Sequence, residues 1–271
     1  MIKWYSPPKD AKIESVAMVV HGLNLNPDKM EAIINMLTLA SIKVLLLSLS
    51  GHGDNYLRVK GKNSADSRME TLKGTNYKVW KEETLSTYQC VKTEAEKDRI
   101  PVYFIGYSLG GLLGCDILVT QPEVQFDKMV LFAPAISLQP FSAAFKWLSP
   151  FSGMVVPSGS PKSYRSNKGT PVTAYLALIN AAIRFKKNLD QQMNVPTLVL
   201  IDKYDELVSY SRLRRLIASM KLDRWQLYRI KKDSDANRFL QHHLILDADT
   251  TGLKAWGKLE DRLLAHLKME R

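Results

Sequence analysis

The feature that most constrains the fold is a series of short, fully apolar segments that alternate along the chain with amphipathic ones. The apolar segments are rich in Val, Ile and Leu and cover residues 16–20, 43–49, 101–105, 128–134 and 196–201. Several intervening segments repeat apolar residues three to four positions apart, which is typical of helices. Strands that are apolar on both faces belong to parallel sheets covered by helices on both sides. The sequence therefore predicts an α/β fold with a mostly parallel central sheet.

One interval is too long for a simple crossover. About 60 residues separate the strands expected at 128–134 and 196–201, whereas a crossover between parallel strands needs only a dozen or more. This interval contains many aromatic residues and then a second helical pattern at 172–187. We expect a core formed by residues 1–135 and 194–271, with an insertion at 136–193. Residues 54–74 read as a polar, Lys-rich loop.

A nucleophile motif lies between an apolar strand and a helix. The residues Gly106-Tyr107-Ser108-Leu109-Gly110 fit the pattern G-x-S-x-G. In a nucleophile elbow, this pattern forces the serine into a strained turn, and the glycines remove side chains that would collide there. The serine hydroxyl then lies at a helix N-terminus, where negative charge is favoured. We expect Ser108 to be a nucleophile.

Four further motifs accompany the elbow: Val20-His21-Gly22-Leu23, Ser50-Gly51-His52-Gly53-Asp54, Asp205-Glu206-Leu207-Val208 and His242 near the end. With them, the chain resembles the α/β-hydrolase superfamily, and within it the group of carboxylesterases, monoacylglycerol lipases and lysophospholipases. The resemblance implies the α/β-hydrolase fold with a small lid formed by the insertion. It also implies an oxyanion hole made of the backbone N–H groups of Leu23 and Leu109, with His21 and His52 as structural residues.

The acid and the base each have two candidates. The family pattern Gly-x-x-Asp-x-x-Val places Asp205 as the acid, while Asp202 stands where the family has glycine and reads as a solvated loop residue or a rival acid. His242 and His243 are adjacent, and only one can meet Ser108. In relatives an acidic residue often follows the catalytic histidine by five positions, so counting back from Asp247 selects His242.

These residues predict a serine ester hydrolase that forms an acyl-enzyme on Ser108, without a metal or an organic cofactor. The preferred substrates are small esters with short to medium acyl chains. The alternative is a monoacylglycerol lipase or lysophospholipase acting on lipid esters, and a non-catalytic binding protein is a remote third interpretation. We expect the acyl group to contact aromatic and aliphatic side chains of the lid, namely Phe141, Phe145, Trp147, Leu148 and Phe151.

Composition sets wider limits. The formal net charge is +11, but the basic residues are dispersed and no nucleic-acid-binding motif accompanies them. We therefore expect no nucleic-acid partner and only a weak attraction to anionic membrane surfaces. Two cysteines cannot form a zinc cluster. The first residues lack an apolar leader pattern, so the simplest expectation is a cytoplasmic protein; its oligomeric state is left open.

Overall fold

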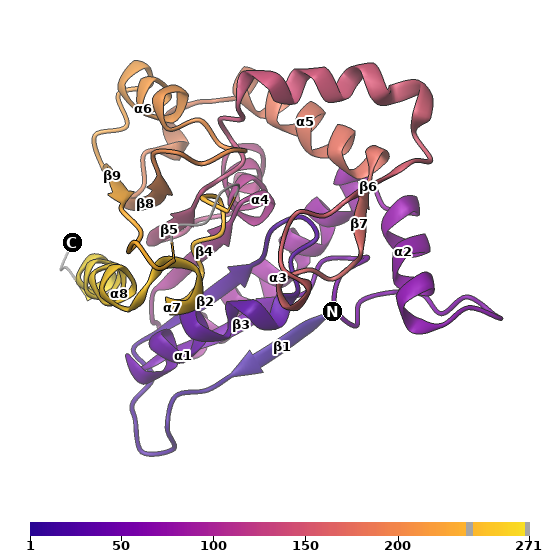
Figure 1. Cartoon of the computed structure of the whole chain (residues 1–271). Coiled ribbons are helices and arrows are strands. Elements are labelled where there is room, and N and C mark those ends of the chain that lie inside the picture. Colours follow the sequence, from indigo (N-terminus) through magenta and orange to yellow (C-terminus); the bar gives the residue numbers. More distant parts are fainter. Residues whose placement is uncertain (237–240, 269–271) are drawn as a thin grey trace.

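The computed structural model describes residues 1–236 and 241–268. In this part of the chain a seven-stranded sheet runs in the order β1-β3-β2-β4-β5-β8-β9 (Figure 1). All neighbours are parallel except the edge strand β1, which runs antiparallel to β3. The strands are β1 (Ile2–Tyr5), β2 (Ser15–Val20), β3 (Ile42–Leu47), β4 (Val102–Tyr107), β5 (Lys128–Phe132), β8 (Thr197–Asp202) and β9 (Trp225–Ile230). The α/β prediction is confirmed.

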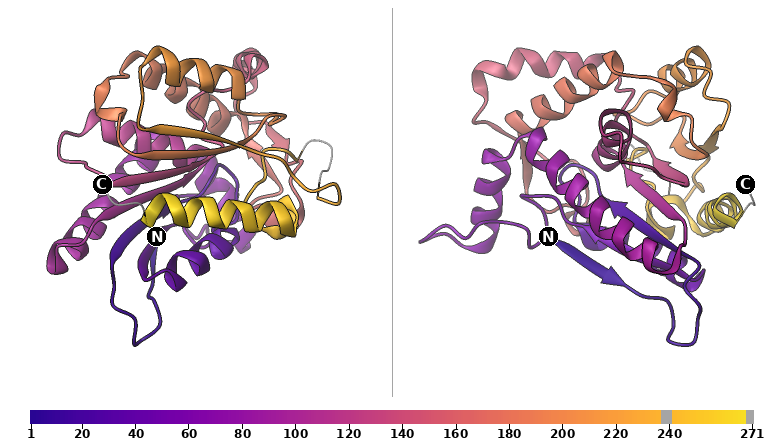
Figure 2. Two further views of the ribbon diagram at one scale, coloured as in Figure 1. Left: turned by 90° about the vertical axis from the view of Figure 1, so that its left-hand side faces the viewer. Right: turned by 180° about the vertical axis from the view of Figure 1, so that it is seen from behind.

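Helices cover both faces of the sheet, as the fully buried central strands require. Figure 2 shows α1 and α8 on one face and α3 and α4 on the other. The helices of the core are η1 (Pro27–Met30), α1 (Glu31–Leu39), α2 (Ser64–Gly74), α3 (Tyr77–Asp98), α4 (Leu109–Thr120), α6 (Tyr210–Ser219), α7 (Ala248–Thr251) and α8 (Leu253–Lys268).

Helix α2 corrects the prediction of a polar loop over residues 54–74. Its mean hydropathy is low and only two of its side chains are buried, so apolar periodicity could not reveal it. The local signal is a cap instead: the Asn63 side chain accepts a hydrogen bond from the backbone N–H of Asp66 at 2.9 Å. Such a cap supplies an acceptor that the first helical turn otherwise lacks.

The chain between β5 and β8 forms a separate layer above the carboxyl ends of the strands. It contains η2 (Pro140–Phe151), β6 (Val155–Pro157), η3 (Lys162–Tyr164), β7 (Gly169–Pro171), α5 (Val172–Lys187) and η4 (Gln191–Met193). Strands β6 and β7 pair with each other and not with the main sheet. Figure 1 shows η2 and α5 together at the top of the molecule. Below, residues 136–193 of this segment are called the insertion.

Candidate active site

Ser108 occupies the sharp turn between β4 and α4. Its φ of 51° lies in the left-handed region, which few residues other than glycine adopt. The neighbouring glycines allow the turn: a Cβ on Gly110 would lie 2.1 Å from the carbonyl oxygen of Val20, and one on Gly106 would lie 2.7 Å from the backbone of Gly111. Helix α4 therefore packs directly against β2, and the sequence pattern G-x-S-x-G has the geometry of a nucleophile elbow.

A continuous chain of hydrogen bonds leads from Ser108 to a buried carboxylate. Ser108 Oγ lies 2.9 Å from His243 Nε2, and His243 Nδ1 lies 2.8 Å from Asp205 Oδ2. A carboxylate can only accept, so the Nδ1 of His243 carries the proton and the Nε2 of the neutral ring is free to accept from the serine hydroxyl. The three groups are at most 7% exposed. This is the arrangement of an activated nucleophile.

The predicted contact of His242 with Ser108 is wrong. His242 points the other way and pairs with Asp202, with 2.9 Å between Nδ1 and Oδ2. Two backbone hydrogen bonds fix the orientation of its neighbour: Tyr107 donates its hydroxyl to the carbonyl of His243, and Glu206 accepts from the N–H of His243. The position of Asp247, which caps α7, does not constrain these contacts, so counting back from it selected the wrong histidine.

The carboxylates are placed by the turn that follows β8. Asp205 Oδ1 accepts from the backbone N–H groups of Leu207 and Val208 at 2.8 and 2.7 Å, which leaves Oδ2 for the histidine. Asp205 is therefore where the sequence predicted it. Asp202 is not the solvated residue that we expected, since it is 4% exposed and accepts from the N–H of Tyr204 as well as bonding His242.

The charges around His243 favour its protonated form. Burial alone would lower the pKa of His243, but the charge and hydrogen bond of Asp205, with the charge of Glu206, outweigh burial and raise the pKa above its ordinary value. The buried amine of Lys232 acts in the opposite direction. A histidine that takes a proton readily next to the serine hydroxyl is suited to general-base chemistry.

The two residues expected to supply the backbone donors of an oxyanion hole both lie beside Ser108. Leu109 is the first residue of α4, so its N–H has no acceptor within the helix. Leu23 follows Gly22, where an added Cβ would lie 3.1 Å from the Cβ of Ser108, and Leu23 itself lines the cavity above the serine. The loop of Leu23 thus lies directly against the nucleophile.

Two buried histidines brace that loop. His21 Nε2 accepts from the N–H of Leu49, and His52 Nε2 accepts from the N–H of Asn24. Burial lowers the pKa of His21, and it lowers the pKa of His52 to about 4. Both rings are therefore neutral near pH 7, and their contacts are structural, as the resemblance implied.

The insertion is tied to the same loop. Ser166 donates its N–H to the carbonyl of Asn24, and Asn167 exchanges two hydrogen bonds with the side chain of Asn24. Asn26 donates to the carbonyl of Tyr164, and the amide of Asn167 reaches the carbonyl of Gly51. These residues of the insertion, 164–167, are called the strap below.

A cavity of about 360 Å³ opens above Ser108, between the core and the insertion. Its walls combine apolar side chains with hydroxyl groups and one carboxylate: Leu23, Leu25, Tyr107, Phe141, Ser158, Ser160, Tyr164, Thr170, Tyr175, Leu178, Glu206, Leu207 and Leu244. The volume of this cavity and its mixture of apolar and polar lining residues suit a small organic substrate.

Of the five lid residues predicted to line this cavity, Phe141 does so. Trp147 and Phe151 are 85% and 62% exposed and are not among its lining residues. The side chains of Phe145 and Leu148 lie outside the part of the chain that the structure describes. The prediction missed Tyr175 and Leu178, although their spacing of three along α5 places them on one helix face.

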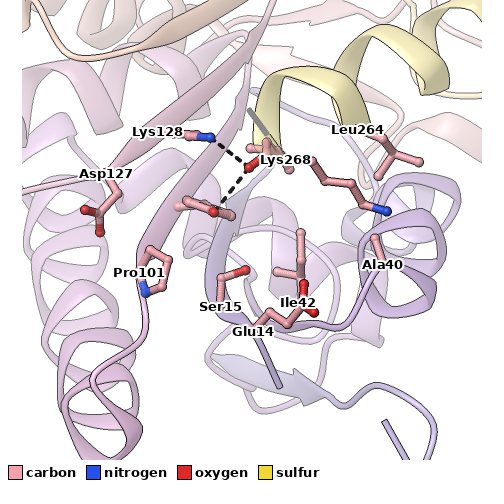
Figure 3. Close-up of a pocket in the computed structure, with 11 residues that line it drawn as sticks. Glu14, Ser15, Ala40, Ile42, Pro101, Asp127, Lys128, Leu264 and Lys268 are labelled. Atoms are coloured by element: carbon pink, nitrogen blue, oxygen red, sulfur yellow. Dashed lines mark hydrogen bonds between the residues drawn. The ribbon is translucent and has the colours of Figure 1, made fainter. Parts of the chain in front are cut away.

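A second cavity, of about 480 Å³, lies at the opposite end of the strands (Figure 3). Lys128 lines it and donates to the carbonyls of His266 and Leu267 near the end of α8. A cation at a helix C-terminus complements the helix dipole. We therefore assign Lys128 to anchoring α8 and not to the chemistry of Ser108.

Residues 11–169, more than half of the chain, match the family described as serine aminopeptidase, S33. No curated protein matches the sequence. No helix among residues 1–236 and 241–268 has both the length and the apolarity to cross a bilayer.

Solved structures resemble the fold over almost its whole length. The metagenome-derived lipolytic enzymes LipS and LipT are represented by a structure with a TM-score of 0.70 and 18% identity, covering 97% of each chain. A soluble variant of monoglyceride lipase from Saccharomyces cerevisiae, in complex with a substrate analog, has a TM-score of 0.71 and 12% identity over 99% of this chain and 92% of that one. The monoacylglycerol lipase of Paleococcus ferrophilus has a TM-score of 0.66 and 17% identity over 98% of both.

Proposed function

The chain belongs to the serine aminopeptidase S33 family of α/β-hydrolases, and we propose that it hydrolyses carboxylic esters with Ser108 as the nucleophile, His243 as the base and Asp205 as the acid that orients the base. The observation that carries this proposal is the unbroken hydrogen-bond chain from Ser108 Oγ through His243 to Asp205 Oδ2. A non-catalytic binding protein would have no need to keep all three groups buried and aligned.

The reaction follows from the positions of these groups. His243 Nε2 removes the hydroxyl proton as Ser108 Oγ attacks the ester carbonyl, and Asp205 stabilises the imidazolium that forms. The N–H groups of Leu23 and Leu109 hold the developing oxyanion, a contribution of several kcal/mol in such sites. The imidazolium then protonates the leaving alcohol. Water, deprotonated by His243, finally hydrolyses the acyl-enzyme.

The substrate we favour is an ester with a short to medium acyl chain, since a cavity of about 360 Å³ has limited room. The insertion, residues 136–193, acts as a lid in this proposal because its residues form one wall of the cavity. A second candidate is a monoacylglycerol. Hydroxyl groups of Ser158, Ser160 and Tyr175 and the carboxylate of Glu206 line the cavity, and such groups would suit the free hydroxyls of a glycerol ester. Relatives in fold include enzymes named as monoacylglycerol lipases.

The test is hydrolysis of p-nitrophenyl esters of increasing chain length beside a monoglyceride and a lysophospholipid. Ser108→Ala and His243→Ala should each lose most of kcat, by about six orders of magnitude if the triad acts as a unit as in subtilisin. The matched control is His242→Ala, a neighbouring histidine that also pairs with an aspartate, and it should stay within about tenfold of wild type.

A fluorophosphonate probe should label wild type at Ser108 alone. The proposal fails if Ser108→Ala is still labelled, or if His242→Ala loses more activity than His243→Ala.

A further inference from the structure

The insertion contains no acidic residue over almost its whole length. Residues 136–189 include seven Lys and Arg residues and neither Asp nor Glu. At the average frequency of this chain, 27 acidic residues in 271, about five would be expected there. The basic residues are therefore not part of the mixed-charge surface seen elsewhere, where several lysines pair with Glu or Asp. A segment whose charged residues are all positive points to an anionic partner.

Part of this charge combines with a second basic helix. Helix α5 ends with Arg184, Lys186 and Lys187, and α6 carries Arg212, Arg214 and Arg215; we call these six residues the cationic patch. Helices α5 and α6 lie at the same end of the molecule in Figures 1 and 2, and in keeping with this, partial burial and then the charge of Arg212 lower the pKa of Lys186. Within residues 1–236 and 241–268, no ion pair involves a member of the patch.

Apolar side chains are exposed beside the patch. Phe141, Trp147 and Phe151 of η2 are 55%, 85% and 62% exposed, and Met154 just after it is 44% exposed; we call these four the apolar ridge. Figures 1 and 2 show η2, α5 and α6 at the same end of the molecule in all three views. Helices η2 and α5 also pack against each other, so the helices that carry the ridge and the patch lie at one end of the molecule.

We propose that this end of the molecule binds the surface of an anionic phospholipid bilayer, with the cationic patch against the headgroups and the apolar ridge inserted between them. Basic residues add affinity for anionic lipid, and exposed Trp and Phe side chains favour the interface between headgroups and acyl chains. A nucleic acid would also attract the patch, but it offers no environment for Met154 and the other exposed apolar side chains. The combination therefore favours lipid.

The same orientation would serve the site already described. Phe141 belongs to the ridge and also lines the cavity above Ser108, as does Leu207, which is 43% exposed. A bilayer at the ridge would thus lie at the entrance of the cavity. Binding itself requires neither catalysis nor the ester-hydrolase proposal, so each can fail without the other.

The experiment is co-sedimentation of the full-length Ser108→Ala protein with phosphatidylcholine vesicles, with and without phosphatidylglycerol. We expect binding only to the anionic vesicles and weakening as salt is raised. The quadruple variant K186Q/K187Q/R214Q/R215Q changes only exposed members of the patch. Each cation near an anionic leaflet contributes about fivefold to affinity, so the loss of four cations should weaken binding by about 600-fold.

The matched control neutralises four exposed lysines far from the insertion: K9Q/K12Q/K254Q/K258Q has the same formal net charge. It should lose less than about tenfold in affinity. Trp147→Ser should lose about tenfold while keeping the salt dependence, because it removes an inserted ring and no charge.

Three results would overturn the proposal. Equal losses in the two quadruple variants would mean that only the net charge matters. Unchanged binding in the patch variant would exclude the patch. Equally tight binding to a double-stranded DNA fragment, with Trp147→Ser binding vesicles like the parent protein, would mean that the patch binds polyanions in general. Circular dichroism of each variant verifies that it is folded.

Discussion

Lys232 offers the sharpest test of how His243, the proposed base, is held in place. Its amine is buried, with the residue only 8% exposed, and donates to the carbonyls of Gln241 and Leu244, both at 2.6 Å. These two carbonyls flank His243 in sequence. Lys232 therefore fixes both ends of the short segment that carries the base, and we predict that Lys232→Met, which keeps the approximate length of the side chain, will loosen it.

The size of the effect follows from these contacts. A hydrogen bond from a charged donor contributes about 1.5–3 kcal/mol, so two bonds amount to about 3–6 kcal/mol. The substitution also removes the cost of burying an ammonium group, which offsets several kcal/mol of the loss. We expect a net loss of about 1–3 kcal/mol in the free energy of unfolding. A displacement of about 1 Å in a catalytic group can cost about a hundredfold, so kcat should fall tenfold to a hundredfold with little change in KM.

The charge of Lys232 gives a second, independent readout. Its positive charge lowers the pKa of His243. Without it the pKa of His243 should rise, and the acidic limb of the pH profile of kcat/KM should move to higher pH. Lys232→Arg keeps the positive charge, so the acidic limb of its pH profile of kcat/KM should lie at the same pH as in wild type even if its kcat is lower.

The assay is hydrolysis of a soluble p-nitrophenyl ester across the pH range, together with thermal unfolding. Lys231→Met, a change at the exposed neighbour, is the control and should leave kcat and the midpoint of unfolding almost unchanged. An acidic limb and a kcat in Lys232→Met equal to those of wild type would refute the reasoning.

Three further outcomes are expected. Asp205→Asn should lower kcat by about 10³–10⁴-fold, whereas Asp202→Asn should cost less than about tenfold, and reversed losses in ester hydrolysis would reassign the acid. His21 and His52 are held neutral in the fold, so their contribution to the free energy of unfolding should be fully present above about pH 6.5 and should decline as the pH falls towards their lowered pKa values. Thermal unfolding between pH 7 and 4 measures this decline, and a midpoint that does not change with pH would contradict it. Phe141→Ala should shift the optimum of kcat/KM towards longer acyl chains with little change for acetate esters, and an unmoved optimum would remove Phe141 from the acyl site.

Features set by the local chain were predictable from the sequence. The elbow around Ser108 needs small residues on both sides of the serine, so it can be recognised as a sequence motif. Fully buried strands can be recognised as runs of apolar residues. The position of Asp205 was also predictable, because the short turn after β8 fixes how far this residue lies from the end of the strand. The backbone N–H groups of the same turn hold its carboxylate in place.

Features set by distant contacts were not predictable. The choice between His242 and His243 depends on the hydrogen bonds of the His243 backbone, which accepts from Tyr107 and donates to Glu206, and no spacing rule along the chain encodes them. The residues of the insertion that line the cavity were also not predictable. An aromatic residue such as Trp147 is expected to be buried, but it is exposed, because amphipathic patterning does not indicate which face of η2 packs against the rest of the protein.

The strap has a consequence for the motions of the insertion. Because residues 164–167 share a hydrogen-bond network with Asn24 and Asn26, this half of the insertion cannot swing away without breaking up the loop that presents the N–H of Leu23. Any opening is therefore confined to η2 and its flanks, and in hydrogen exchange the strap amides should be protected like the sheet while those of η2 exchange early. Deleting the whole insertion to widen the entrance would leave the side chain of Asn24 without these partners, so a truncated enzyme should lose turnover even towards the smallest esters.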